Sequence, residues 1–458
     1  MNRRQGLPDG AAARLRTILG GTGLVVVSNR GPRAPVRGGA VRPASGVVTA
    51  LEPVIRACGG TWIAQGARSY DLAAGVHVRA VSLTASERRG HYHGFSNAGL
   101  WRWCHGIGGP PAFRAEDWRL YRAVNRRFAD AVIDEIAGRR ALVFVHDYHL
   151  ALVPAMLRAR RPDVAVAAFW HVPWPDAGEG FPWLDEIVRG VRAGHVLGFQ
   201  TAGDARRFTR MAAGRDEAGA VARIGRYPAS IAWPADPAAP RRALRARLRR
   251  RLGVPMAATL AVGIDRFDRI KGLLEKLVAI ERLFDRRPGW VGRLVLVQVA
   301  APARRSGDDE RRYRAAVRRV AQRINARFGR RGYRPVRLLE ARHDAGAVAD
   351  LLRAADLCLV TSLREGMNLV AKEFVASQDD AQGVLVLSRG AGAAHELKDA
   401  LLVEPARVDA LADTIDRAAR MPLAERRARM ARLRAVVRDA DVHRWAARLF
   451  AHALAGRS

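Results

Sequence analysis

Short apolar runs alternate with polar or glycine-containing loops and with amphipathic stretches along almost the whole chain. The runs have the length and β-branched content of buried strands. In the first half they are LVVVSNR, ALVFVHDYHL, VAVAAFWHVPWP and HVLGFQT, and in the second half TLAVGIDRF, RLVLVQVAAP, DLCLVTSL and GVLVLSRGAGAAHEL. Strands that alternate with helices at this spacing predict an α/β fold with doubly wound parallel sheets and right-handed crossovers.

The two series of strands are separated by YPASIAWPADPAAPRRALRARLRRRLGVP, which is rich in Pro, Ala and Arg and has no strand pattern. A chain of 458 residues is long enough for two domains with separate cores. We therefore expect the domains to meet near residues 230–255, with an N-terminal domain over 1–235 and a C-terminal domain over 236–435. In such sheets ligands bind beyond the carboxyl ends of the strands, so polar residues that directly follow strands are the candidates for chemistry.

The stretch LREGMNLVAKEF, residues 363–374, follows one predicted strand and opens a predicted helix. Gly366 breaks the apolar pattern and Asn368 is a good N-cap, so the helix begins just after it. Free amides and the helix dipole make such a junction a site for anions. Glu365 and Asn368 can bind sugar hydroxyls, and Glu373 can accept a hydrogen bond from a ribose. The alternative is structural: Asn368 serves only as a cap and Glu373 only as a dipole partner.

A second pair of candidates lies in GIDRFDRIKGLLEKL. A strand is predicted to end near Ile264, and Arg266 and Lys271 fall in the loop before the next helix. An Arg fork and a mobile ammonium suit a diphosphate group. The alternative is two surface cations in a very basic protein. The helix that follows has a single apolar stripe, made of Leu273, Leu277, Ile280 and Phe284.

In the first half, Asp147 directly follows one strand and His171 another. Both side chains are expected to point into a cleft. A lone histidine in a core is usually structural, but the position of His171 directly after a strand favours a functional role. His146, His149 and His171 have the spacing of a possible zinc set, but no acidic partner pattern accompanies them. We therefore expect no metal.

Candidates near the N-terminus are less specific. Arg30 stands at a strand end, and Gly46 precedes a predicted helix, which is a second possible seat for an anion. Trp62, Tyr92 and Trp101 are rings of the kind that line sugar pockets. Aromatic residues are more often part of a core, and this alternative remains open for each of the three.

Composition restricts the possible partners. Lys and Arg number 78 against 44 Asp and Glu, a net charge of +34. That excess suggests nucleic acid or an acidic substrate; the alternative is that Arg and Ala are simply abundant in this chain. The Arg residues are scattered through helices without interleaved aromatics, so we expect no specific nucleic-acid partner. The three cysteines lie far apart without a CxxC, which fits a reducing cytoplasm. No apolar run is long enough to span a bilayer, and the N-terminus lacks a signal-peptide core, so we expect no membrane partner.

Five motifs in one order, HDYHL, GFSNAGLW, DRFDRIKGL, GMNLVAKEF and GVLVLS, resemble the trehalose-6-phosphate synthase family of retaining glucosyltransferases. The resemblance runs from VVVSNRGP to DVHRWAARLF, nearly the whole chain. It implies the GT-B fold, two Rossmann-like domains with the active site in the cleft between them, and a last helix over 436–458 that returns to the N-terminal domain. It also implies transfer of glucose from a nucleotide-diphosphate glucose to glucose 6-phosphate with retention, without a metal cofactor.

The resemblance also assigns roles to individual residues. The residues implied in catalysis are Asp147, His171, Arg266 and Lys271. Those implied in donor binding are Arg266, Lys271, Glu365, Gly366, Met367, Asn368, Leu369, Val370 and Glu373. Those implied in acceptor binding are Arg30, Trp62, Tyr92, Trp101, Asp147, Tyr148 and Arg305. Glu365 stands where the family usually has Asp, so this carboxylate is one methylene longer.

Three other interpretations remain open from the sequence. A related transferase would use another phosphorylated acceptor, such as glycerol 3-phosphate. A regulatory homologue would have lost catalysis, although the residues implied in it are retained. A nucleic-acid-binding protein would show affinity that depends steeply on salt. The base of the donor nucleotide and the formation of a homo-oligomer are also left open.

Overall fold

The computed structural model describes residues 9–32, 46–176, 180–213, 222–234, 240–302, 308–341 and 344–456. The chain forms two compact units, each with its own parallel sheet. Unit 1 contains the described residues up to Ala232 and those from Asp441 onward, and unit 2 contains those from Trp233 to Ala440. The predicted α/β class with two doubly wound sheets is confirmed. Among the described helices, none is both long and apolar enough to cross a membrane.

Unit 1 is built on an eight-stranded sheet in the order β3-β4-β2-β1-β5-β6-β7-β8. Neighbouring strands are parallel, except that β3 and β4 form an antiparallel pair. The strand order reverses between β1 and β5, which is the place where doubly wound sheets bind ligands. The strands are β1 (Gly23–Arg30), β2 (Gly60–Gln65), β3 (Tyr70–Ala73), β4 (Val76–Val81), β5 (Ala141–His146), β6 (Ala165–Trp170), β7 (Val196–Phe199) and β8 (Arg223–Arg226).

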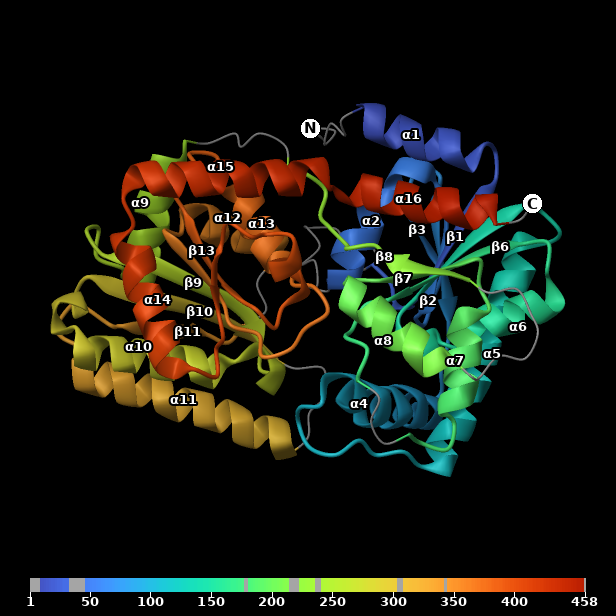
Figure 1. The fold of residues 1–458 in the computed structure, drawn as a ribbon, viewed down its shortest axis with the longest axis horizontal. Helices are drawn as coiled ribbons and strands as arrows, with labels where there is room; N and C mark the ends of the chain where they lie inside the picture. Colours follow the sequence, from blue (N-terminus) through green and yellow to red (C-terminus); the bar gives the residue numbers. More distant parts are fainter. Residues whose placement is uncertain are drawn as a thin grey trace. The chain divides into compact units, whose positions relative to one another are not determined.

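Helices cover both faces of this sheet. On one face α5 and α6 pack against β1, β5 and β6, and on the other α16 packs against α1, α2 and the sheet (Figure 1). The helix α16 follows α15 of unit 2 in the chain and begins at an Asp441 cap, whose side chain accepts from the amide of Arg444. The helices of unit 1 are α1 (Asp9–Leu19), α2 (Gly46–Cys58), α3 (Ala85–Glu87), the π-helix η1 (Arg88–Leu100), α4 (Trp101–His105), α5 (Ala115–Ile136), the 3₁₀ turn η2 (Tyr148–Leu150), α6 (Val153–Arg160), α7 (Leu184–Arg192), α8 (Ala202–Ala212) and α16 (Val442–Ala455).

Unit 2 is built on a six-stranded, fully parallel sheet in the order β11-β10-β9-β12-β13-β14, so its order reverses between β9 and β12. Helices α10, α11 and α14 pack together over one face of this sheet, while α9, α12, α13 and α15 form a second group (Figure 1). The strands are β9 (Thr259–Arg266), β10 (Leu294–Ala301), β11 (Val336–Leu339), β12 (Leu357–Val360), β13 (Val384–Ser388) and β14 (Leu401–Val403). The helices are α9 (Arg241–Leu252), η3 (Arg269–Lys271), α10 (Leu273–Arg286), η4 (Pro288–Trp290), α11 (Asp308–Phe328), α12 (Ala345–Ala354), α13 (Leu369–Ser377), η5 (Gly392–His395), α14 (Val408–Arg420) and α15 (Leu423–Asp439).

Two local predictions in unit 2 can be compared with the structure. The apolar stripe of α10 is confirmed, since Leu273, Leu277, Ile280 and Phe284 are all buried in the core. The predicted end of the preceding strand, near Ile264, is two residues too early. Strand β9 continues to Arg266, which pairs in register with Ala301 of β10, so Arg266 is the last strand residue and not part of a loop.

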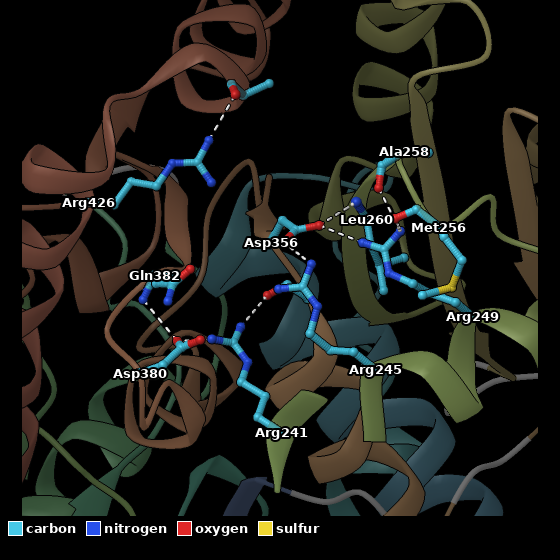
Figure 2. Close-up of polar contacts among 12 residues, drawn as sticks. Arg241, Arg245, Arg249, Met256, Ala258, Leu260, Asp356, Asp380, Gln382 and Arg426 are labelled. Carbon is cyan, nitrogen blue, oxygen red and sulfur yellow. Dashed lines mark hydrogen bonds and ion pairs between the residues drawn. The ribbon is translucent and has the colours of Figure 1, made fainter. Parts of the chain in front are cut away.

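The basic stretch without a strand pattern, where the domains were expected to meet, contains helix α9, and two of its arginines, Arg241 and Arg249, are internal. Arg249 is only 2% exposed and donates to the carbonyl oxygens of Pro255, Met256 and Ala258 (Figure 2). Its other terminal nitrogen pairs with Asp356 at 2.9 Å. Arg249, one of the many arginines behind the large positive charge, therefore attaches α9 to the sheet.

Candidate active site

In unit 2, the loops that follow β9 and β12 are joined at the point where the strand order reverses. The amide of Leu363 donates to the carbonyl oxygen of Ile270 at 2.6 Å. The hydroxyl of Thr361 donates to the carbonyl oxygens of Lys271 and Gly272 at 3.1 and 3.0 Å. These bonds hold η3 against the segment that leads into α13, so the two groups of candidate residues lie next to each other.

We expect Gly272→Ala to break this junction. Gly272 has a φ of 62°, and a Cβ built on it would meet the carbonyl oxygen of Thr361 at 2.1 Å. The left-handed backbone alone costs about 1–2 kcal/mol for a residue with a side chain, and a clash with backbone adds to that cost. Gly292→Ala is the matched control, because Gly292 has a φ of 89° with nothing near its Cβ position. Urea denaturation should show a clearly larger loss of stability for Gly272→Ala; equal losses would contradict the close contact.

Lys271, Glu365 and Asn368 form one contact group at this junction. Lys271 is 7% exposed, and its ammonium pairs with Oε1 of Glu365. Oε2 of Glu365 accepts from the Ser362 hydroxyl at 2.6 Å and from Nδ2 of Asn368 at 3.0 Å. Burial by itself would raise the pKa of Glu365, but the charge of Lys271 and these hydrogen bonds outweigh it and lower the pKa to about 2. Glu365 is therefore ionised throughout the physiological range.

The amino end of α13 begins directly beside this group. Asn368 caps the helix as predicted, with its Oδ1 accepting from the amide of Ala371 at 3.0 Å. Its φ of 115° is rare for a residue other than glycine, and such strain is concentrated at functional sites. Leu369 and Val370 open the helix, where backbone amides have no partner within the helix and favour an anion.

Gly366 and Met367 are fixed by the neighbouring 3₁₀ turn η5. The amide of Ala393 donates to the carbonyl oxygen of Met367 at 3.2 Å. A Cβ on Gly392 would meet the carbonyl oxygen of Gly366 at 1.8 Å, so only glycine fits there. This packing holds the backbone between Glu365 and Asn368 in a single arrangement.

Arg266 and Glu373 lie on either side of the contact group in sequence. The Arg266 guanidinium lies 3.4 Å from Oδ2 of Asp268, and Oδ1 of Asp268 accepts from the amide of Ile270. Arg266 is thus tied to the turn that carries Lys271. Burial raises the pKa of Glu373, on α13, to about 7. A carboxyl group with such a pKa at this edge of a sheet is a candidate ligand contact.

In unit 1, Asp147 and His171 are joined at the carboxyl ends of β5 and β6. Oδ1 of Asp147 accepts from the backbone amide of His171 at 3.2 Å, and Oδ2 lies 3.8 Å from Nδ1 of His149. Asp147 has a φ of 73°, so this unit also has a strained residue directly after a strand, at its own reversal of strand order. Its carboxylate is therefore held in a fixed place.

The His171 ring is held by two residues that the sequence analysis did not single out for this purpose. Nε2 of His171 lies 3.0 Å from Nδ1 of His146, whose pKa is lowered by burial and by His171. Nδ1 of His171 lies 3.4 Å from Nε2 of Gln200, and Oε1 of Gln200 accepts from the amide of Ala229, which fixes the amide orientation. Gln200 directly follows β7, so the criterion of a polar residue directly after a strand, which selected His171, also applies to Gln200. Within the described ranges, no group of three His, Cys, Asp or Glu side chains is placed to hold a metal.

Arg30 and Tyr92 also come together in unit 1. Arg30 ends β1 and is exposed; its guanidinium contacts the Tyr92 hydroxyl and lies 5.5 Å from the centre of that ring. Tyr92 in turn stacks on His149 at 5.6 Å. Trp101 is half-buried at the start of α4. The predicted Arg305 lies outside the described residues, as do residues 33–45, which directly precede Gly46 at the start of α2.

Two residues that are predicted to contact the acceptor lie in the interior of unit 1. Trp62 and Tyr148 are both 0% exposed. The indole N–H of Trp62 donates to the Ser28 hydroxyl at 2.8 Å, and the Tyr148 hydroxyl donates to Oδ1 of Asn97 at 3.1 Å. Their polar atoms are used inside the unit and no ring surface is open to a ligand. We therefore leave both residues out of the proposed site.

The sequence profile of Glycosyltransferase family 20 matches residues 61–215 and 239–455 of the chain. The chain belongs to this family. The match includes every candidate of unit 2 described above, together with Asp147, His171 and Gln200, while Arg30 lies before it. The resemblance inferred from the five motifs is confirmed.

Individual members of Glycosyltransferase family 20 are similar over nearly their whole length. A trehalose-6-phosphate synthase of Mycobacterium avium (strain 104) is 37% identical, covering 98% of both chains. A solved structure of the E. coli protein, described as bound with UDP-2-fluoro glucose, has a TM-score of 0.81 and 31% identity over 93% of this chain and 97% of that one. The synthase of Burkholderia xenovorans in complex with glucose-6-phosphate has a TM-score of 0.81 and 30% identity over 92% and 98%.

Proposed function

We propose that this chain transfers glucose from a nucleotide-diphosphate glucose to glucose 6-phosphate, with retention, and so forms trehalose 6-phosphate. The observation that carries the proposal is the meeting of Lys271, Glu365 and the amino end of α13 where the strand order of unit 2 reverses. A buried cation beside free helix amides suits a diphosphate. The family membership and the synthases named above support the same reaction.

The donor is proposed to bind in unit 2. Transfer breaks the bond between the anomeric carbon and the diphosphate oxygen, so negative charge grows on the leaving group. Lys271, Arg266 and the amides of Leu369 and Val370 stabilise that charge in a preorganised site. These groups need no metal ion to do so, and activity should persist in a chelator. The description of the E. coli structure supports uridine as the first base to test.

The acceptor is proposed to bind in unit 1. Arg30, exposed and braced by Tyr92, offers a cation to the sugar phosphate. Asp147, held by the amide of His171, accepts a hydrogen bond from the acceptor and orients it without attacking carbon. The acceptor oxygen then forms the new bond on the face from which the diphosphate leaves, and the leaving phosphate takes its proton. The cytoplasm is proposed as the site of the reaction, because three cysteines that lie far apart without a CxxC fit a reducing compartment.

Product identification tests this proposal. The purified chain is incubated with glucose 6-phosphate and with UDP-, GDP- or ADP-glucose, and products are identified by mass spectrometry and NMR. We expect trehalose 6-phosphate with both anomeric carbons in the α configuration. A parallel reaction with glycerol 3-phosphate tests the alternative acceptor. A product only with glycerol 3-phosphate, or none with any pair, would contradict the proposal.

Donor affinity is expected to depend on pH through Glu373. Its pKa of about 7 means that the neutral acid predominates below that pH in the free protein. A ribose hydroxyl donates more strongly to the carboxylate, so binding releases a proton. The dissociation constant for the nucleotide sugar should then rise by up to about tenfold for each pH unit below about 7. Calorimetric titration at several pH values measures this, and Glu373→Gln should flatten the profile. An unchanged profile in that variant would rule out the role of Glu373.

A further inference from the structure

We propose that Glu365 is a built-in counter-ion for Lys271: the donor diphosphate must share the ammonium with this carboxylate, and the carboxylate thereby weakens binding of the nucleoside diphosphate product. This inference rests on the proposed function, because it assumes that Lys271 meets a diphosphate. It goes further by assigning Glu365 a role in product release.

The carboxylate is fixed in place by more than the lysine. One oxygen is held by the Ser362 hydroxyl and the Asn368 amide group, while the other meets Lys271. Both supporting residues lie on the segment that carries Glu365, and that segment is bonded to η3 through Leu363 and Thr361. Glu365 therefore cannot swing away when a ligand arrives.

Little water can reach the Lys271 ammonium to replace the Glu365 carboxylate as its partner. Lys271 is 7% exposed, and Glu365 remains ionised because its pKa is about 2. In a poorly hydrated site a cation that already has one carboxylate gains less from a second anion than an unpaired cation would. The diphosphate must therefore share the ammonium with Glu365, and departure of the product returns the ammonium to Glu365 alone.

Two substitutions at position 365 can test this role. Aspartate at position 365 would end one methylene shorter, so the contact with Lys271 would lengthen while the negative charge stayed. Glutamine would keep the length and remove the charge. The two substitutions separate the effect of side-chain length from the effect of charge. Neither changes the backbone amides at the amino end of α13.

The test is binding of UDP, which lacks the transferred glucose and so does not report contacts to that sugar. Calorimetric titrations compare the full-length wild type with Glu365→Gln, Glu365→Asp, Lys271→Ala and the double variant K271A/E365Q. We expect Glu365→Gln to bind UDP about tenfold more tightly, and Glu365→Asp to show a smaller gain. Lys271→Ala should bind more weakly, and adding E365Q to it should change affinity less than twofold. Glu425→Gln, on α15, controls for the loss of one negative charge elsewhere in unit 2.

The possible outcomes test the counter-ion role of Glu365 and the donor site separately. Equal or weaker UDP binding by both Glu365 variants, or the same gain in the absence of Lys271, would overturn the counter-ion role. A wild type that binds none of UDP, GDP and ADP, or a Lys271→Ala variant with unchanged affinity, would overturn the donor site itself. Thermal melts confirm that each variant is folded, and Glu365→Asp keeps the test valid if the glutamine disturbs the Ser362 and Asn368 contacts.

Discussion

Replacing Lys271 with alanine is expected to lower kcat by about 10²–10³-fold, the scale for losing one preorganised group that stabilises charge in a transition state. Lys271 is buried at the amino end of α13, where charge on the departing diphosphate grows during transfer. Its contribution is therefore larger in the transition state than in the bound donor. The measurement is the initial rate of nucleoside diphosphate release with both substrates saturating.

Two further variants make this result specific. Lys271→Ala leaves the Glu365 carboxylate without its ammonium partner, so part of any loss can come from local disturbance. The double variant K271A/E365Q removes that unpaired charge and should remain as slow as the single variant. Arg269→Ala removes a cation two residues away whose guanidinium lies over the Tyr313 ring, and it should keep near-normal turnover. Near-normal turnover in a folded Lys271→Ala variant would exclude Lys271 from catalysis.

The elements that the sequence predicts correctly are those with local causes. The strand before residue 361, the Asn368 cap and the helix after it follow from neighbouring residues, as does the buried stripe of α10. The fold class follows from the repeated order of these signals. Hydrophobic spacing and capping act over a few residues, which is why one sequence is enough to recognise them.

What the sequence misses depends on contacts between distant segments. The resemblance assigns Lys271 and Glu365 to one donor site, but the direct ion pair between these residues, which are 94 positions apart, comes from the pairing of their loops and was not predicted. Trp62 looks like a candidate for a sugar pocket, but the packing of β2 within the sheet decides that its ring is buried. The strained φ values of Asp147 and Asn368 are likewise imposed by tertiary structure.

The largest loss of stability is expected from Asp356→Ala. In unit 2 this carboxylate pairs with two arginines of α9, Arg245 and Arg249 (Figure 2). Asp356 pairs with Arg245 at 2.6 Å and Arg249 at 2.9 Å, and it accepts from the amide of Leu260 at 2.8 Å. Burial lowers the pKa of Arg249, and the charge of Asp356 opposes that shift. Breaking such a buried pair typically costs about 3–5 kcal/mol, because the remaining ion has no counter-charge.

The expected size follows from how little freedom Arg249 has. Its guanidinium is bonded to three carbonyl oxygens of the segment that precedes β9, and these bonds hold it in the interior when Asp356 is removed. Urea denaturation measures the loss, and Asp350→Ala provides the control. Asp350 is 43% exposed and pairs with Arg247 at 3.0 Å, a surface contact whose removal should cost less than about 1 kcal/mol. If the two variants lost similar stability, the cluster around Asp356 would behave as a solvated surface network, and α9 would be attached to the sheet by its apolar residues alone.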